Sequence, residues 1–291
     1  MKREDRGPFE RDFQLGLIAL GFPLPRYGAD GDIGTETIEA AEAWAYDHVP
    51  RRTEEDYVDF VDEIPETVVD AVNRRYNDLE AEFWDACGKR DFLSDYRDEA
   101  SLAVEHGRNP IERIDTICLH QMACKDSDDQ GVDRWRKLAI HWAVTCGDNA
   151  KAYLMHDLDT YLYHGHGWNR RSVGFEFEGY FSGIGENPRY LWSPRGSGRK
   201  PMVPTPQQIS AGRNAVAWTV EKIAAMGGKI QFIGAHRQSY ATKESDPGSL
   251  IWQEIALWAQ NNLGLKEAPT LPKGSPIPEV WDSRNEGVPY R

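Results

Sequence analysis

Short apolar segments that alternate with helical patterns constrain the fold of the second half of this chain more than any other sequence feature. Each segment is rich in Val, Ile, Leu or aromatic residues, which is typical of a buried strand. A long helical pattern begins at Thr205, which we expect to cap it, and a last one covers residues 250–263. Strands that alternate with helices predict an α/β domain with a mixed central sheet flanked by helices. The expected strands are 114–120, 138–144, 152–155, 173–177 and 230–234.

The N-terminal part of the chain has a purely helical pattern. Apolar residues within 9–20 recur at helical spacing, and we expect Thr35 to cap a second helix that runs through Trp44. The two helices are joined by a turn of sequence Asp-Gly-Asp-Ile-Gly-Thr-Glu-Thr at residues 30–37. We therefore predict a small all-α domain in residues 1–50.

Three further segments complete the expected organisation. Residues 51–110 are charged and contain an amphipathic pattern after Pro65, so we interpret them as a helical connector. The α/β domain is expected to cover residues 111–265. Residues 266–291 are rich in Pro and Gly, which predicts an extended C-terminal tail.

Composition and charge exclude several classes of partner. A net charge of -13 argues against nucleic acid, which binds basic surfaces, and gives no attraction to an anionic membrane. The chain has no signal-peptide pattern and no apolar run of about 18 residues, so we expect it to be made in the cytoplasm. Its 4 cysteines lack the paired spacing of a metal site, which predicts free thiols. We expect a monomer.

Two histidines and a carboxylate lie at or beyond the ends of expected strands. His120 ends the first strand, His236 follows the last, and Asp246 comes later in the chain. Imidazole and carboxylate are zinc ligands, and three protein ligands leave the fourth tetrahedral position open for water. Glu176 is a separate carboxylate that could act as a base beside such an ion. Cys118 is a weaker alternative ligand, because a small buried hydrophobic residue explains it equally well.

These local sequences resemble the zinc-dependent N-acetylmuramoyl-L-alanine amidases. That family includes phage lysozyme-type amidases, cytoplasmic anhydro-muropeptide amidases and animal peptidoglycan recognition proteins. The resemblance implies that His120, His236 and Asp246 bind one Zn²⁺ and that Glu176 is the catalytic base. Glu178 is the alternative base, because strand alternation places it on the same face as Glu176. The matching stretches are residues 119–123, 172–179, 234–236 and 246–248.

Two positions depart from the pattern of this family. Many members carry a Tyr where this chain has Ile140, so a hydroxyl group is missing just before His141, which we expect to pack within the sheet. Several members carry a Lys where this chain has Glu244. Lys243 is one residue earlier and is our candidate for stabilising the oxyanion.

The loop Tyr-His-Gly-His-Gly-Trp-Asn at residues 163–169 resembles the loop beside the substrate groove of the same family. The resemblance implies that His164, Trp168 and Asn169 bind substrate. The alternative is a glycine-rich connection between strands with exposed imidazoles. No role is assigned to His166.

The helical domain in residues 1–50 resembles a small peptidoglycan-binding domain through its Leu-Gly-Phe helix end and its Asp-Gly turn, although such a turn could simply join two helices. Together the two resemblances imply an endolysin-like peptidoglycan hydrolase that cleaves the amide bond between N-acetylmuramic acid and L-alanine. It would act on the cell wall after release. A cytoplasmic muropeptide-recycling amidase is one alternative, but it needs no wall-binding domain. A non-catalytic muropeptide-binding protein is another, but such proteins typically lack one metal ligand.

Overall fold

The computed structural model of the protein describes residues 1–22, 24, 26, 29, 31–49, 60, 62–87, 92–124, 135–183 and 201–282. The chain divides into two compact units, the first consisting mainly of residues 1–89 and the second mainly of residues 90–291. None of the described helices combines the length and the apolar character that a membrane crossing requires. Each unit has its own hydrophobic core.

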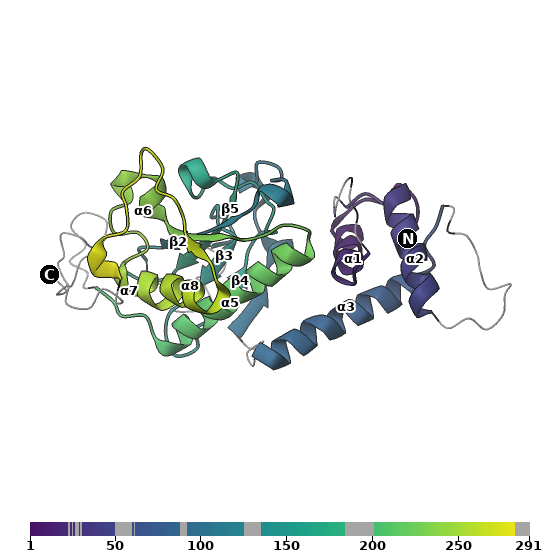
Figure 1. Ribbon diagram of the computed structural model, residues 1–291, viewed down its shortest axis with the longest axis horizontal. Helices are drawn as coiled ribbons and strands as arrows, with labels where there is room; N and C mark the ends of the chain where they lie inside the picture. Colours follow the sequence, from purple (N-terminus) through teal and green to yellow (C-terminus); the bar gives the residue numbers. More distant parts are fainter. Residues whose placement is uncertain are drawn as a thin grey trace. The chain divides into compact units, whose positions relative to one another are not determined.

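The first unit is built from three helices, α1 (Pro8–Ala19), α2 (Thr35–His48) and α3 (Glu66–Cys87), which Figure 1 shows. Its core contains residues from the expected helical domain and also residues from the segment that we interpreted as a connector. The small helical domain therefore extends into α3. Members of this core include Phe13, Leu17, Ile33, Ile38, Trp44, Ile64, Val68, Val69 and Val72.

The start of α2 differs from the prediction. Thr35 is the first helical residue, Gly34 occupies the cap position, and no side chain caps the helix. The hydroxyl oxygen of Thr35 instead accepts a hydrogen bond from Arg3 Nη1 at 2.7 Å. The preceding turn is held by the buried amide of Gln14, which donates to the carbonyl oxygen of Asp32 at 3.0 Å. Asp30, which belongs to the motif in the sequence, lies outside the described residues.

A seven-stranded sheet forms the centre of the second unit, in the order β1-β4-β3-β5-β2-β6-β7. Only β3 and β4 pair antiparallel, and all other neighbours are parallel, so the predicted mixed sheet is confirmed. Helices flank this sheet, as Figure 1 shows, which confirms the predicted α/β class. The strands are β1 (Leu93–Asp95), β2 (Thr116–Gln121), β3 (Trp142–Val144), β4 (Ala152–Leu154), β5 (Ser172–Phe177), β6 (Phe232–Ala235) and β7 (Lys266–Glu267).

The sheet has two edge strands that the sequence analysis did not predict, β1 and β7. They contain three and two residues, which is too short for an alternating pattern to be recognised. β3 is also shorter than the expected strand 138–144, because it begins only at Trp142. The residue before it, His141, is buried, and its side chain bonds to the backbone of neighbouring segments.

One long helix, α5 (Pro206–Ala225), packs on the sheet. The predicted cap is confirmed, because Thr205 Oγ1 accepts a hydrogen bond from the Gln208 N–H at 3.2 Å. Trp142 Nε1 on β3 donates to Thr219 Oγ1 on α5 at 3.0 Å, and both side chains are buried. The predicted closing helix is present as α7 (Ser249–Ile251), a π-helical stretch (Trp252–Leu257) and α8 (Trp258–Leu263).

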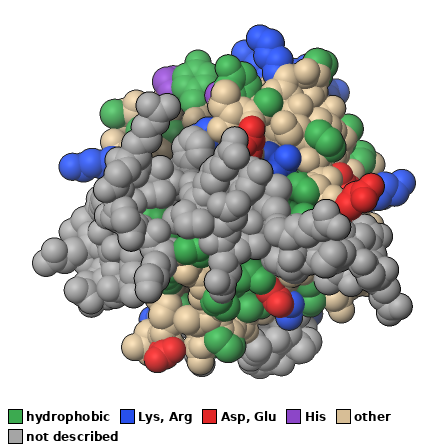
Figure 2. All heavy atoms as spheres, turned by 90° about the vertical axis from the view of Figure 1, so that its left-hand side faces the viewer, with side chains coloured by type: hydrophobic (Ala, Val, Ile, Leu, Met, Phe, Trp, Pro, Cys, Tyr) green, Lys and Arg blue, Asp and Glu red, His purple; other side chains and the backbone are tan. Residues whose placement is uncertain are grey.

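Charged side chains of both signs are mixed with hydrophobic ones on the face of the molecule seen in Figure 2. Among the described atoms of that face, no continuous basic surface is visible.

The buried bond between Trp142 and Thr219 gives a test of how the sheet and α5 are joined. Thr219→Val keeps the shape of the side chain but leaves the indole N–H without its acceptor. We expect the free energy of unfolding to fall by about 1–3 kcal/mol, the usual cost of a buried polar group left unsatisfied. Urea denaturation measures it. In a Trp142→Phe background the same substitution should cost much less, and equal costs in the two backgrounds would show that the bond contributes nothing.

Candidate functional site

The register between β2 and β5 places the first site residues side by side. His120 is paired with Glu176 across the two parallel strands. Their side chains lie close together, with 3.9 Å between His120 Nδ1 and Glu176 Oε1. The neighbouring residue Phe177 lies against Gly212 of α5, and side chains alternate along a strand, so the site is on the sheet face opposite α5.

The next two residues reach the same place from the end of β6. This strand pairs with the other side of β2, and His236 begins the one-turn helix α6 (His236–Ser239) directly after it. Asp246 follows a 3-10 turn, Ala241–Lys243. His236 Nδ1 lies 2.8 Å from His120 Nδ1 and 2.9 Å from Asp246 Oδ2. The structure therefore brings His120, His236 and Asp246 together, with one ligand atom of each within 4.8 Å of the others.

Hydrogen bonding alone does not explain this arrangement of three buried atoms. A ring N–H lies in the imidazole plane and points in one direction, so an N–H on His236 Nδ1 can be directed well at only one of its two neighbours. A cation between two imidazole lone pairs and a carboxylate oxygen would interact favourably with all three. The donor set thus fits a metal ion.

A chain of hydrogen bonds orients His120 for this role. His120 Nε2 lies 3.1 Å from His164 Nδ1, and His164 Nε2 lies 3.3 Å from the carbonyl oxygen of Ser172. A carbonyl only accepts, so His164 carries its proton on Nε2 and accepts at Nδ1. Burial lowers the pKa of His164 to about 3, which keeps this ring neutral. His120 therefore carries its proton on Nε2, and its Nδ1 offers a lone pair toward His236 and Asp246.

Asp246 is oriented in a comparable way by β2. Its Oδ1 accepts a hydrogen bond from the backbone N–H of Gln121 at 2.8 Å, which leaves Oδ2 directed at His236. The buried amide of Gln121 also donates to the carbonyl oxygen of Ser245. Partners of this kind, one shell outside the ligands, fix ligand orientation in metal sites.

Burial controls the charge of the groups around this point. The pKa of His120 lies well below its usual value, first because of desolvation and then because His236 and His164 are close. The pKa of Glu176 lies well above its usual value, first because of desolvation and then because of Asp246, while Lys243 opposes the rise. Lys243 is therefore close enough to act on the charge of Glu176.

The alternative base, Glu178, is placed differently from the prediction. β5 ends at Phe177, and the carboxylate of Glu178 accepts a hydrogen bond from the backbone N–H of Cys146 at 2.9 Å. Glu178 is fully buried in this interaction. In contrast, Glu176 Oε2 is buried without a hydrogen-bond partner among the described residues. Glu176 is therefore the better candidate for a base.

The three residues that were expected to bind substrate are largely buried. Asn169 Oδ1 accepts a hydrogen bond from the backbone N–H of Gly165 at 2.6 Å, and Trp168 packs with Cys118 and Ala268. His164 contacts His120, as described above. These contacts hold the loop and orient the candidate ligand His120, and direct contact with substrate stays a prediction for all three.

Other imidazoles near the site have roles that the sequence did not reveal. His141 Nδ1 accepts the N–H of Gly174 at 3.0 Å, and its Nε2 donates to the carbonyl of Thr160 at 3.0 Å. His166 stacks on Tyr240 with 4.3 Å between ring centroids, and its φ of 50° is unusual for a residue with a side chain. Such local contacts leave no pattern in the sequence.

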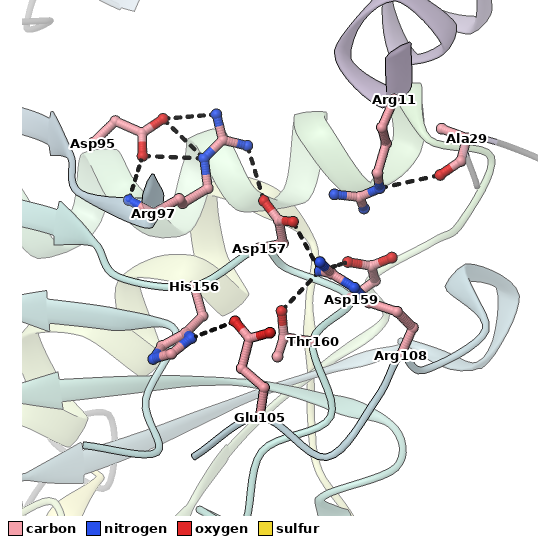
Figure 3. A network of polar contacts seen from close by, with 10 residues as sticks. All are labelled: Arg11, Ala29, Asp95, Arg97, Glu105, Arg108, His156, Asp157, Asp159 and Thr160. Carbon is pink, nitrogen blue, oxygen red and sulfur yellow. Dashed lines mark hydrogen bonds and ion pairs between the residues drawn. The ribbon is translucent and has the colours of Figure 1, made fainter. Parts of the chain in front are cut away.

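A polar network holds the segment that leads from β4 into this loop, as Figure 3 shows. Arg108 Nη1 donates to Asp157 Oδ2 at 2.8 Å and to Asp159 Oδ1 at 2.9 Å. Beside it, His156 Nδ1 lies 2.9 Å from Glu105 Oε1. His156 and Glu105 thus form a separate pair beside the Arg108 network.

Cys118 is the other candidate ligand. Its sulfur forms a second group with His120 and His164, whose ligand atoms also lie within 4.8 Å of one another. The thiol is buried, and desolvation raises its pKa well above the usual value, which opposes formation of the thiolate that binds metals. The group with Asp246 is therefore the better metal site.

Comparison with known proteins identifies the domain that contains this site. Residues 110–249 match the family model described as N-acetylmuramoyl-L-alanine amidase. These residues are a domain of that family. All four residues of the candidate site, His120, Glu176, His236 and Asp246, lie within the matched range. A comparison with curated protein sequences finds no match.

Several solved structures are similar to the chain. The amidase LysC from Clostridium intestinale has 15% sequence identity and a TM-score of 0.40, and the match covers 60% of this chain and 98% of LysC. Drosophila peptidoglycan recognition protein SD has 17% identity and a TM-score of 0.37 over 59% of this chain and 92% of that protein. The Ph2119 endolysin from a Thermus scotoductus bacteriophage has 15% identity and a TM-score of 0.36 over 60% and 99%. These values are too low to transfer an activity to the amidase domain.

The hydrogen bond from His120 to His164 predicts an effect on metal binding. His164→Leu removes the acceptor, so His120 should lose its fixed orientation and the affinity for zinc should fall about 10–100-fold. His164→Gln can supply an amide oxygen in place of Nδ1 and should recover part of the loss. Competition with a chromophoric chelator measures both affinities. If the Leu and Gln variants bind zinc equally well, the acceptor has no part in orienting His120.

Proposed function

We propose that the amidase domain hydrolyses the amide bond between the lactyl group of N-acetylmuramic acid and L-alanine in peptidoglycan, with one Zn²⁺ bound by His120, His236 and Asp246. The observation that supports this most directly is the convergence of His120 Nδ1, His236 Nδ1 and Asp246 Oδ2, with His120 and Asp246 oriented by hydrogen bonds to His164 and Gln121. A second support is the family to which residues 110–249 belong.

The proposed chemistry needs one ion and two protein groups. When bound with an open fourth position, zinc polarises a carbonyl group and lowers the pKa of a water ligand. Glu176 would take the proton of the attacking water and later donate it to the leaving nitrogen. Its raised pKa, caused first by burial, suits a group that must hold a proton during the reaction.

Lys243 would stabilise negative charge on the substrate oxygen during the reaction. Its influence on the pKa values of both Glu176 and His120 supports this role. The neighbouring Glu244 is exposed and would have the wrong sign for that role. The hydroxyl group that many family members place before His141 is replaced by the buried Ile140, so Lys243 and zinc would carry this part of the reaction.

Replacement of Glu176 tests its role as the base. Glu176→Gln should keep the fold and the zinc but lower the rate of amide hydrolysis about 10²–10⁴-fold, the usual contribution of a general base. The assay is release of stem peptide from a soluble muropeptide, detected by mass spectrometry. The matched control is Glu244→Gln, an exposed carboxylate two residues from Asp246, which should keep the rate within about twofold. A Glu176→Gln enzyme with near-normal turnover would exclude this mechanism.

We further propose that the first unit binds the cell wall and that the whole protein acts on peptidoglycan like an endolysin, after synthesis in the cytoplasm and release. The support is the resemblance of residues 1–50 to a peptidoglycan-binding domain, together with two exposed aromatic side chains. Phe9 is 58% exposed and Tyr46 is 55% exposed. Exposed aromatic rings can stack on sugar rings, and their replacement does not disturb a core.

Wall binding predicts a difference between insoluble and soluble substrates. Tethering raises the local substrate concentration on a polymer, but it has no effect on a small fragment. The double variant Phe9→Ala/Tyr46→Ala should pellet less with purified sacculi and digest them more slowly, while it hydrolyses a soluble muropeptide at the normal rate. The control is Glu39→Ala, also in α2 and exposed. If the double variant pellets as well as the parent protein, Phe9 and Tyr46 have no part in wall binding.

A further inference from the structure

The segment of residues 266–281, which we call the strap, follows the last large helix and runs along α6. It begins as β7, which pairs with β6. Three backbone hydrogen bonds then join it to the segment that follows His236: from Leu271 to Gln238 at 2.9 Å, from Ala241 to Lys273 at 2.7 Å, and from Ser275 to Arg237 at 2.8 Å. The strap lies outside the residues that match the amidase family, which end at 249.

The side chain of Gln238 joins the strap to the backbone next to His236. Its Oε1 accepts the N–H of Ala235, the residue before His236, at 2.9 Å. Its Nε2 donates in the opposite direction, to the carbonyl of Ala268 at 2.9 Å and to Glu267 Oε1 at 3.0 Å. Gln238 is fully buried, so its bonds to Ala235 and Ala268 are shielded from water. Its bond to Glu267 is only partly buried.

The far end of the strap is anchored as well. Trp281 is fully buried and its indole N–H donates to the carbonyl of Gly183. The guanidinium of Arg237 lies 5.0 Å from the Trp281 ring centroid. On the way, Leu271 packs with Trp168 from the loop that carries His164. The strap therefore contacts two segments that meet at the candidate metal site.

α6 needs such support because it is only one turn long. A helix of four residues has almost no stability of its own, since helix nucleation is unfavourable. On the side of β2, Asp246 is held by Gln121, as described above. On the other side, Arg237, Gln238 and Ala241 bond to the strap, and Arg237 also donates to the carbonyl oxygens of Glu244 and Asp246.

We infer that the strap is a positioning element of the metal site: by holding α6 through Gln238, it keeps His236 at the distance from His120 and Asp246 that one ion requires. This inference rests on the proposed zinc site. It assigns to the C-terminal segment, and to Gln238, a role in metal affinity. It also means that the domain needs the strap, which lies beyond residue 249, to bind its metal.

The test removes the donor of Gln238 and leaves its acceptor in place. Gln238→Glu keeps an oxygen for the Ala235 N–H but places a carboxylate against the carbonyl of Ala268 and the carboxylate of Glu267. We expect zinc affinity, measured on the full-length protein by chelator competition, to fall about tenfold or more, as for other partners of ligand residues. The amide protons of Leu271 and Ser275 should exchange faster with solvent. Adding Glu267→Gln to this variant restores one hydrogen-bond donor between residues 238 and 267, and it should recover part of the zinc affinity.

Controls separate the possible outcomes. Thr270→Ala, at an exposed position of the strap, should keep the affinity and the exchange rates of the parent protein. If the parent protein binds no zinc, the proposed function fails. If it binds zinc and Gln238→Glu binds it equally well, whether or not the strap exchanges faster, the site stands and the strap has no role in it. Should Gln238→Glu fail to fold, Trp281→Phe loosens the far end only, and a normal zinc affinity with faster strap exchange in that variant would equally overturn the inference.

Discussion

The parallel pairing of β2 with β5 on one side and with β6 on the other is the constraint on which the site depends. The register with β5 places Glu176 beside His120. In the register with β6, that strand ends next to Leu119, so that the following residue, His236, lies near both side chains. A slip of one residue would move His120 to the opposite face, where α5 packs. The buried bond between Trp142 and Thr219 and the other contacts of α5 thus also determine the side of the sheet on which chemistry can occur.

Within this frame, burial determines the electrostatics. His120, His164 and His141 all have lowered pKa values because of desolvation, so all three are neutral bases near neutral pH. Neutral imidazoles are the form that binds metals. Two carboxylates, Glu176 and Asp246, lie close together, and Asp246 is one cause of the raised pKa of Glu176. A divalent cation would relieve both the repulsion between the carboxylates and the unsatisfied lone pairs, which is why the cluster fits a metal better than it fits a hydrogen-bond network.

Much of the sheet, and the set of residues that meet at the candidate site, could be predicted from the sequence, because long apolar strands and local motifs are read over a few neighbouring residues. What could not be predicted depends on contacts between distant segments. Thr35 has the right residue type for a cap, but Arg3 uses its hydroxyl group. His164 occupies a loop position that suggested substrate binding, yet its ring bonds to His120 from 44 residues away. The strap has the composition of a tail, and only its bonds to α6 reveal it as part of the domain.

The convergence of the candidate ligand atoms is therefore produced largely by other residues. Gly174 is an example: a Cβ there would lie 2.5 Å from His164 Nδ1 and would push that ring away from His120. Gly234 is another, since a Cβ there would lie 2.6 Å from the Trp168 ring, on which the strap residue Ala268 also packs. These close approaches let the loop, the sheet and the strap meet around one point. The loop, the sheet and the strap each limit the movement of the others. The geometry of the site therefore follows from packing, and His120, His236 and Asp246 need no strong attraction for one another to be held in place.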